Sequence, residues 1–409
     1  MSRKTKTTTT KEVGKPALTP KLRFPEFRDA EGWHATPGDE LFEQINNRQA
    51  HAGLPILAIT QEHGAIPRDA IDYHVSVTDK SVETYKEVQP GDFIISLRSF
   101  QGGIEYSEYH GICSPAYVIL RKRAELSDQF FKPLFKSHSF IQQLTKNLEG
   151  LRDGKMISYK QFSELLLPNP TQPEQQKLAE CLSSVDEVIA AQSRKLDAFK
   201  THKKGLMQEL FPREGETQPR LRFPEFQNAP EWVVKTLGKV GKNLDNRRVP
   251  ITANERESGD VPYYGASGIV DFVKDFIFDE DLLCVSEDGA NLVARTYPIA
   301  FPISGKAWVN NHAHVLWFKN PCMQKFVEVY LNSINLGDFI TGIAQPKLNK
   351  AMLNSIPIPH PTVPEQQCIA DGLTSLDNLL AAQTQKLEAL KTHKKGLMQQ
   401  LFPSPEEEV

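Results

Sequence analysis

Two stretches of the chain place apolar residues at alternating steps of three and four positions. They span residues 173–212 and 364–403, and about 26 of their 40 aligned positions are identical without a gap. This spacing, held over several heptads, is typical of a coiled coil. The positions predicted to face a partner helix are Leu182, Val185, Ile189, Gln192, Leu196 and Phe199 in the first stretch, and Leu373, Leu376, Leu380, Gln383, Leu387 and Leu390 in the second.

Each stretch is predicted to form one long helix, and the two helices are predicted to pair. An apolar stripe along about 57 Å of helix is too costly to leave in water. The alternative is that each helix packs only on its own globular domain. A glutamine at the same seam position in both copies favours pairing, because a polar seam residue can fix register. We expect an antiparallel pair, which spreads the two glutamines over different layers. The expected neighbours are Gln192 with Leu387 and Leu196 with Gln383.

A second repeat precedes each long helix. The sequence KLRFPEF at 21–27 recurs as RLRFPEF at 220–226, and Trp33 and Trp232 follow at the same spacing. We expect these segments to be structural anchors with buried aromatic side chains. The repeats predict the following parts: a disordered basic tail at 1–20, a first variable block at 21–170, a first spacer helix at 171–212, a linker at 213–219, a second variable block at 220–361, a second spacer helix at 362–403 and an acidic tail at 404–409.

Both variable blocks are predicted to mix helix and strand, so the fold class is α+β. In each block, β-like runs precede a helix-like run and a short Pro-rich strand. The runs are 54–60, 92–97, 116–120 and 128–148 in the first block, and 282–285, 299–303, 314–318 and 323–335 in the second. Because the order of elements matches while the sequences differ, we expect two versions of one fold.

Composition narrows the class of protein. The net charge of −3 over 409 residues argues against a uniformly basic surface but allows local basic patches. Five scattered cysteines without a C-x-x-C pair indicate neither a zinc site nor a disulfide framework, which fits a reducing cytoplasm. The sequence has no apolar run long enough for a membrane span and no secretory signal.

Motifs for catalysis are missing from the sequence, and we therefore expect that the chain is not an enzyme and holds no cofactor. There is no G-x-G-x-x-G and no complete phosphate loop. Ser304-Gly305-Lys306 resembles the end of such a loop, but Ala300 and Ala307 replace residues that it needs. The Asn/Asp-Pro-Pro-Tyr/Phe signature of amino-group methyltransferases is also absent.

Loops between the hydrophobic runs hold the candidates for DNA contact. Arginine can read guanine and glutamine adenine in the major groove, and lysines neutralise phosphates. The candidates are Arg98, Ser99, Gln101, Arg152 and Lys155 in the first block, and Tyr263, Tyr264, Ser267, Asn291, Lys306, Asn311, His312, His314, Gln345 and Lys347 in the second. For the cluster at 310–314, three interpretations stay open: contact with a base or phosphate, a structural polar cluster, or a metal site. No third ligand pattern supports the metal, so none is predicted.

The repeated segments that border each variable block, together with the two spacer helices, form a frame that occurs twice. This double frame resembles that of the specificity (S) subunits of type I restriction–modification systems. The doubled LRFPEF with its tryptophan, the doubled PEQQ opening and the doubled KTHKKGLMQ-x-LFP ending carry the resemblance across residues 20–403. The run from Tyr263 to Val315 resembles one recurring kind of target-recognition domain. The resemblance implies that each variable block is a target-recognition domain and that the two are related by a pseudo-twofold axis.

The resemblance also implies partners. A specificity subunit reads a bipartite, asymmetric site in double-stranded DNA and docks two methyltransferase (M) subunits, which use S-adenosylmethionine. Restriction–translocase (R) subunits that use ATP and Mg²⁺ join the larger complex. Two other classes remain as alternatives: a stand-alone sequence-specific DNA-binding regulator or adaptor, and a nuclease or fused methyltransferase–nuclease. The missing motifs oppose the second.

Overall fold

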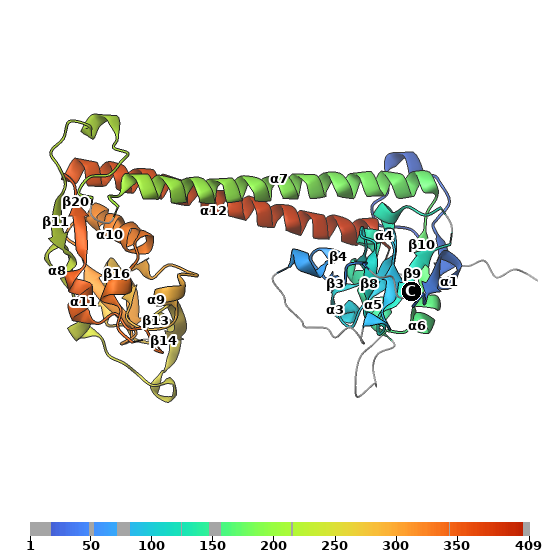
Figure 1. Cartoon of the computed structure of the whole chain (residues 1–409), viewed down its shortest axis with the longest axis horizontal. Coiled ribbons are helices and arrows are strands. Elements are labelled where there is room, and N and C mark those ends of the chain that lie inside the picture. The colour runs from blue at the N-terminus through green and yellow to red at the C-terminus, as the bar shows by residue number, and fades with distance from the viewer. Residues whose placement is uncertain are drawn as a thin grey trace, which may run out of the picture. The chain divides into compact units, whose positions relative to one another are not determined.

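The structure, a computed structural model, describes residues 18–48, 53–71, 82–123, 125–146, 157–213, 216–342 and 344–403 (Figure 1). The chain divides into two compact units. Unit 1 comprises residues 1–193 and 386–409, and unit 2 comprises residues 194–385. The predicted acidic tail and residues 1–17 of the predicted basic tail lie outside the described residues. Leu18 forms a β-bridge with Trp33, so the described structure of unit 1 begins before residue 21.

The two long helices form where the apolar spacing predicts them. Helix α7 spans Gln172–Leu210 and helix α12 spans Val363–Leu401, and each has 39 residues. Their ends fall within two residues of the repeated Pro-x-x-Pro-Glu and Leu-Phe-Pro borders, because proline is tolerated in the first turn of a helix but stops its continuation. Each helix contributes one part to unit 1 and the other part to unit 2.

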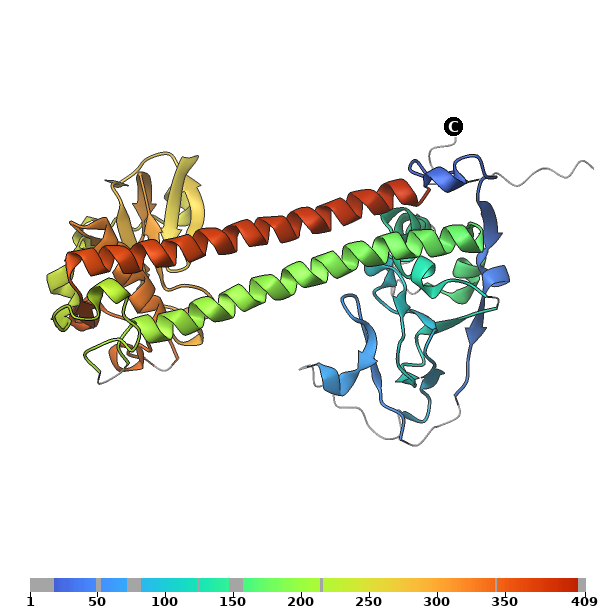
Figure 2. The same ribbon diagram turned by 90° about the horizontal axis from the view of Figure 1, so that it is seen from above.

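Within each unit the two helices lie antiparallel (Figure 2). In unit 1, Lys394 near the end of α12 donates to both carboxylate oxygens of Asp186, near the start of α7, at 2.5 and 2.7 Å. In unit 2, Lys203 near the end of α7 pairs with Asp377, near the start of α12. The repeat aligns Lys203 with Lys394 and Asp186 with Asp377. The same ion pair is therefore present in both units. This confirms the predicted antiparallel direction.

Burial along the helices follows the predicted seam. The most buried seam positions are Leu182, Gln192, Leu196, Leu373 and Leu387, each at most 7% exposed. The partly buried positions are Val185, Ile189, Phe199, Leu376, Leu380, Gln383 and Leu390. The expected pairing of each glutamine with a leucine stays a prediction.

Block 1 is built on a four-stranded antiparallel sheet. Its strands are β2 (Phe42–Ile45), β9 (Val118–Lys122), β6 (Phe93–Ile95) and β7 (Glu105–Tyr106), in that spatial order. Three smaller pairs accompany it: β1 (His34–Pro37) with β10 (Leu166–Asn169), β3 (Leu57–Thr60) with β4 (Gly64–Pro67), and β5 (Lys86–Val88) with β8 (Gly111–Cys113). The helices are η1 (Pro25–Phe27), α1 (Gly38–Leu41), η2 (Arg68–Ala70), α3 (Ser99–Gly102), α4 (Asp128–Leu134), α5 (His138–Thr145) and α6 (Tyr159–Ser163).

The single helix expected over 128–148 is two helices, α4 and α5. Pro133 lies inside α4 and lacks the backbone N–H that would continue the ladder. Ser137 then caps α5, since its Oγ accepts a hydrogen bond from the Phe140 amide. The break follows from residues visible in the sequence, and the periodicity alone did not reveal it.

Block 2 has a main sheet of the same topology and a second sheet. The main sheet contains β12 (Lys242–Asn243), β19 (Ala313–Trp317), β16 (Leu282–Ser286) and β17 (Ala300–Ile303), and the second contains β14 (Gly268–Val273), β13 (Ser258–Gly265), β18 (Lys306–Val309) and β15 (Phe278–Asp279). Strand β11 (Val233–Thr236) pairs with β20 (Pro357–His360). The helices are η4 (Pro224–Phe226), α8 (Leu237–Val240), η5 (Asp245–Arg247), η6 (Ala253–Glu255), α9 (Asn291–Ala294), α10 (Pro321–Ser333), η7 (Gly337–Phe339) and α11 (Lys350–Ser355).

The two blocks are versions of one fold, as predicted. The order β2–β9–β6–β7 of block 1 corresponds strand for strand to β12–β19–β16–β17 of block 2, and β1–β10 corresponds to β11–β20. In both blocks the helical region packs on the main sheet within one hydrophobic cluster. The second sheet, β14–β13–β18–β15, is where the blocks differ most.

Each block is fastened to the helices by the same arginine–glutamate clamp. Arg23 of the first marker donates through Nε and Nη2 to Glu174 of α7 at 2.7 and 2.8 Å. Arg222 of the second marker donates in the same way to Glu365 of α12, at 2.6 and 2.8 Å. The side chains of both glutamates are at most 2% exposed. This is the physical role of the repeated LRF and PEQ segments.

The end of each long helix completes the core of a block. Leu401 and Phe402, at the end of α12, belong to the block 1 core, where the Phe402 ring meets Phe130 at 5.7 Å. Phe211, at the end of α7, belongs to the block 2 core, where its ring meets Phe326 at 5.0 Å. Each unit is thus a block closed by the start of one helix and the end of the other. Among the described residues, the helices that reach membrane-spanning length lack the apolar character to cross a bilayer.

Candidate nucleic-acid interface

Three loops of block 2 meet at one edge of its main sheet. They are residues 287–290, 310–312 and 344–348, and we call them together the loop surface. The first two meet because Ser286 and Ala313 are opposite each other in the β16–β19 ladder. The Glu287 amide donates to the His312 carbonyl at 2.8 Å, and the Leu348 amide donates to the Glu287 carbonyl at 2.8 Å. These backbone bonds hold the three loops in one surface.

Four predicted contact residues are exposed on the loop surface: Asn311, His312, Gln345 and Lys347. The Lys347 ammonium lies 3.2 Å from Glu287 Oε1, and half of its side chain is exposed. The His312 ring nitrogen Nδ1 lies 2.8 Å from Asp288 Oδ2. A phosphate can reach Lys347 and His312 from solvent without rearrangement of the backbone.

His314, another predicted contact residue, is fully buried and supports the loop surface from below. Its Nδ1 lies 2.6 Å from Asp245 Oδ2, and its Nε2 lies 2.7 Å from the Leu348 carbonyl. Both ring nitrogens are thus within hydrogen-bonding distance of an oxygen atom, which fixes the orientation of the ring. His314 therefore joins η5, β19 and the third loop, and direct contact between its side chain and DNA is not supported.

The Asp245 carboxylate is held in its charged form. Burial alone raises its pKa, but the hydrogen bond and charge of His314, with the Val315 amide and the Asn243 side chain, bring the pKa below its usual value. The Val315 amide donates to Oδ1 at 2.9 Å. The carboxylate is thereby fixed as the acceptor that orients His314.

Asp245, Glu287 and His314 together form a donor set that could hold a metal ion, with ligand atoms within 4.8 Å of one another. The Arg248 guanidinium already contacts both carboxylates of this set. Its Nη1 lies 2.7 Å from Glu287 Oε2, and its Nη2 lies 3.5 Å from Asp245 Oδ2. The two carboxylates are therefore already engaged by the arginine and by the histidine ring. The arrangement favours the structural interpretation of the 310–314 cluster over the metal.

The predicted contacts at Ser267 and Asn291 shape a neighbouring turn. The Ser267 hydroxyl lies 2.9 Å from the Tyr297 hydroxyl, and both side chains are exposed. Asn291 is buried, and its Oδ1 accepts from the Thr296 amide and hydroxyl, both at 3.0 Å. Ser267 is therefore available to a ligand, whereas Asn291 holds the loop that presents Tyr297.

Tyr263, Tyr264 and Lys306 lie on the second sheet of block 2. Tyr263 is 1% exposed and donates to the Ile251 carbonyl at 3.3 Å, so its predicted contact with DNA is not supported. Tyr264 is half-buried and stacks on Phe301. The Lys306 ammonium is exposed and lies 4.7 Å from the centre of the Phe276 ring.

In block 1, the predicted loop forms the short helix α3 directly after β6. Arg98 and Gln101 are exposed at its start and on its surface, whereas Ser99 is buried and its Oγ accepts from the Ser96 amide at 2.9 Å. Gly103 ends the helix with φ +78°, and a Cβ there would lie 2.0 Å from the Phe135 carbonyl oxygen. Only glycine fits this position. Arg152 and Lys155 lie outside the described residues.

Several buried charged residues were not among the predicted site residues. In block 1, Asp92 is 1% exposed and accepts two hydrogen bonds from Arg121 at 2.7 Å each. In block 2, Arg248 and Asp245 support the loop surface through Glu287 and His314. Their partners are tens of residues away in sequence, so no local motif marks them.

Comparisons with known proteins agree with this architecture. Residues 230–392 match the family described as the type I restriction modification DNA specificity domain. A Haemophilus influenzae protein that carries the name of a type I restriction enzyme specificity subunit is 37% identical over 149 residues, which cover 36% of this chain and 38% of that relative. The MjaVIII specificity subunit of a type I restriction enzyme from Methanocaldococcus jannaschii is 24% identical over 356 residues, or 80% of this chain and 81% of the relative.

Two solved structures share the fold. A chain from a study of complex assembly and conformational transition in the type I R-M system has a TM-score of 0.59 at 16% identity, and the match covers 91% of this chain and 98% of that one. The type I restriction–modification S subunit from M. genitalium has a TM-score of 0.52 at 17% identity, with 94% and 99% covered. These comparisons confirm the predicted resemblance: residues 230–392 match the type I restriction modification DNA specificity domain, and the chain has the fold of a type I specificity subunit.

Proposed function

We propose that this chain is the DNA-specificity subunit of a type I restriction–modification complex and that each block reads one half of a bipartite site. One observation carries the proposal. The two blocks share a topology and the same arginine–glutamate clamp, but their exposed loops have unrelated sequences. A duplicated frame with different contents suits a protein that must hold two different DNA sequences in one fixed geometry.

The bases and phosphates would meet the exposed candidates of each block. In block 2 these are Asn311, His312, Gln345 and Lys347 on the loop surface, with Ser267 beside it; in block 1 they are Arg98 and Gln101. Lysine and histidine supply sequence-independent contacts to phosphate, while arginine, glutamine and asparagine match the edges of guanine and adenine. Because the two sets differ, the site would be asymmetric.

The spacing of the two half-sites follows from B-DNA. Two modules that enter the major groove from one side sit about 10 bp apart, centre to centre. If each reads roughly 3–4 bp, about 6–7 bp between them stay unread. The antiparallel helices would act as the spacer between the two blocks.

The partners would be two methyltransferase subunits on the repeated faces of the helices. The segment Lys-Thr-His-Lys-Lys occurs at 200–204 and 391–395, and paired alanines occur at 190–191 and 381–382. All four alanines are exposed. A surface present twice offers the same docking patch twice. The methyltransferase subunits would bring S-adenosylmethionine, and restriction subunits would bring ATP and Mg²⁺, while this chain would hold no cofactor and perform no catalysis.

Replacing residues 220–361 with the matching block of a relative tests the proposal. Sequencing of methylated bases in cells that carry the hybrid should show that one half of the methylated site changes and the other half stays. A change in both halves would contradict the one-block, one-half-site arrangement. Binding of labelled S-adenosylmethionine by the purified chain would favour an enzyme, and tight specific DNA binding without any methyltransferase would favour a stand-alone regulator.

A further inference from the structure

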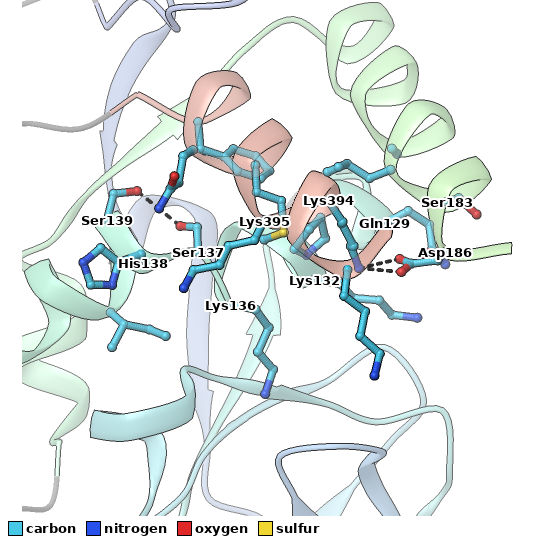
Figure 3. Close-up of a pocket in the computed structure, with 18 of the residues that line it drawn as sticks. Gln129, Lys132, Lys136, Ser137, His138, Ser139, Ser183, Asp186, Lys394 and Lys395 are labelled. Atoms are coloured by element: carbon cyan, nitrogen blue, oxygen red, sulfur yellow. Dashed lines mark hydrogen bonds and ion pairs between the residues drawn. The ribbon is translucent and has the colours of Figure 1, made fainter. Parts of the chain in front are cut away.

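A lysine-rimmed cavity of about 750 Å³ opens in unit 1 between α4, α5 and the two long helices (Figure 3). Its apolar lining includes Leu182 of α7 and Phe402 at the end of α12. Among its lining residues, the lysines are Lys21, Lys132, Lys136, Lys391, Lys394 and Lys395, and Asp186 is the one acidic residue. Such a rim over an apolar floor suits an acidic polypeptide segment.

Some of these lysines already have carboxylate partners. Lys394 binds Asp186, as Figure 3 shows, and Lys132 and Lys136 pair with glutamates of block 1. Lys391 pairs with Glu388 one turn earlier on α12, but both side chains are more than half exposed. Exposed pairs of this kind exchange readily for other partners. Lys395 has no carboxylate partner among the described residues. The α12 side of the rim is therefore where an anionic segment would bind.

Unit 2 contains the same frame with the chain unbroken, and it serves as a template. There α7 runs through Phe211 into the linker and on to the second marker, and the Leu221 amide donates to the Glu209 carbonyl at 2.9 Å. In unit 1 the Leu22 amide donates to the Gln400 carbonyl at 3.0 Å. The repeat aligns Leu22 with Leu221 and Gln400 with Glu209, so the marker meets the helix end in the same way in both units.

The linker of unit 2 contributes an ion pair to this junction. Glu216, five residues after Phe211, accepts from Arg220 Nη2 at 3.1 Å. By the repeat, Phe211 corresponds to Phe402 and Arg220 corresponds to Lys21. The position of Glu216 then falls on Glu407, in the middle of the run Glu406–Glu408.

We propose that Glu406–Glu408 bind the lysine rim of this cavity, with Glu407 toward Lys21 and the neighbouring carboxylates toward Lys391 and Lys395. The reach is sufficient, because four residues beyond Pro403 span at most about 14 Å. Lys395 lies eight residues before Pro403, or about 12 Å along the helix, and Lys391 lies twelve residues before it, or about 18 Å. The five residues that follow Pro403, up to Glu408, span at most about 18 Å, so Glu408 can reach Lys391 when the segment is extended. A segment tethered this closely has an effective concentration in the millimolar range. It replaces, without a covalent bond, the linker that closes the same junction in unit 2.

Two properties favour this chain's own segment over DNA as the occupant: the segment is acidic, and it is covalently attached to the end of α12. Three consecutive glutamates meet a rim whose α12 side carries Lys391 and Lys395. The apolar floor would gain nothing from a phosphate backbone. The contact closes the junction between the first marker and the end of α12, and it keeps other acidic segments out of the cavity.

Zero-length carbodiimide cross-linking of the full chain, mapped by mass spectrometry, tests the contact. Cross-links should join the peptide with Glu406–Glu408 to Lys21, Lys391 or Lys395. In the variant E406Q/E407Q/E408Q, the acetylation rates of Lys391 and Lys395 should rise about two- to fivefold, the factor expected of exposed ion pairs. The matched control E216Q alters the unit 2 linker and should leave both rates unchanged.

Charge exchange provides a second measurement. Lys21→Glu should lower the yield of these cross-links, and Lys21→Glu with Glu407→Lys should restore protection of Lys391 and Lys395. If the glutamine variant shows unchanged acetylation and the full chain shows no such cross-links, the proposal is overturned. It is equally overturned if added DNA protects the same lysines to the same extent in both proteins, because the cavity is then open to DNA with the segment present.

Discussion

The clamp between Arg23 and Glu174 offers the sharpest test of how the repeated frame holds a block. Arg23 donates to both carboxylate oxygens of Glu174 and also to the carbonyls of Ala30 and Glu31, each at 2.9 Å. The carboxylate raises the pKa of the Arg23 guanidinium through the hydrogen bond between them, although burial acts against this. We predict that Arg23→Met lowers the free energy of opening of unit 1 much more than the double variant R23M/E174Q does.

The magnitude follows from what each variant leaves behind. In Arg23→Met, a carboxylate with a 2% exposed side chain loses its partner, and breaking a buried pair in this way costs about 3–5 kcal/mol. Because the Arg23 residue is partly exposed, water can enter beside the carboxylate, and we expect the lower end of this range, about 3 kcal/mol. In the double variant no unpaired charge remains. The loss is then about 1–2 kcal/mol, from the hydrogen bonds to the two carbonyls.

Amide hydrogen exchange, followed peptide by peptide, resolves the effect within one unit. A loss of about 3 kcal/mol raises the exchange of protected amides in unit 1 by roughly a hundredfold. Peptides of unit 2 should keep their wild-type rates. Arg222→Met is the matched control, because it removes the same clamp to Glu365 and should produce the mirror result, with fast exchange in unit 2 only.

The comparison of single and double variants can refute the reasoning. If Arg23→Met and R23M/E174Q accelerate exchange equally, an unpaired buried carboxylate is not the source of the loss. If either single variant loosens both units to the same extent, the clamps do not act on separate blocks.

Three further outcomes are expected. Lys347→Ala should weaken DNA binding about equally for all sequences and reduce the magnitude of the slope of log affinity against log salt concentration by about one. Arg98→Ala should instead lower the binding free energy by about 1–3 kcal/mol for sites with one particular base at one position. Binding titrations at several salt concentrations measure both effects. The pKa of Asp245 is depressed in the folded state, so its stabilisation is present above the unfolded value of about 3.9 and is lost as pH falls through the folded value. Urea unfolding should therefore show that Asp245→Asn destabilises unit 2 at neutral pH and flattens the loss of stability below about pH 4. One heptad inserted at matched places in α7 and α12 should lengthen the helices by about 10 Å and widen the unread gap by about 3 bp; a methylated site with an unchanged gap would show that the helices do not set the spacing.

Features that repeat or have a period could be read from the sequence. The long helices were predicted to within two residues because their apolar spacing persists over many turns and prolines border them. The correspondence of the two blocks was predicted from the order of hydrophobic runs. The arginine–glutamate clamp could also have been predicted, because Arg23 and Glu174 are oppositely charged residues that recur as Arg222 and Glu365. Repetition in sequence marks residues that share one structural task.

The loop residues gave no comparable signal. Tyr263, His314 and Asn291 have the polar or aromatic character of contact residues, yet all three are buried and satisfy hydrogen bonds within block 2. Exposure depends on which way a strand or loop faces, and the short strands of block 2 do not alternate regularly enough to show it. Arg248 reaches Glu287 across 39 positions of sequence, which only the folded chain brings together.

The repeated helices meet the two variable blocks through contacts of the same kind, although the blocks differ in sequence. Phe130 of block 1 and Phe326 of block 2 lie in sequences with little likeness, but each presents an aromatic ring to the repeated phenylalanine at a helix end. Edge-to-face packing of this kind requires an aromatic ring at one place and says little about the residues around it. The loop surface of block 2 is held instead by His314, Asp245 and Arg248, whose hydrogen bonds join residues of block 2. We therefore expect that a block which exchanges its loops and the polar network beneath them must keep the aromatic ring that meets the helix end and the arginine–glutamate clamp.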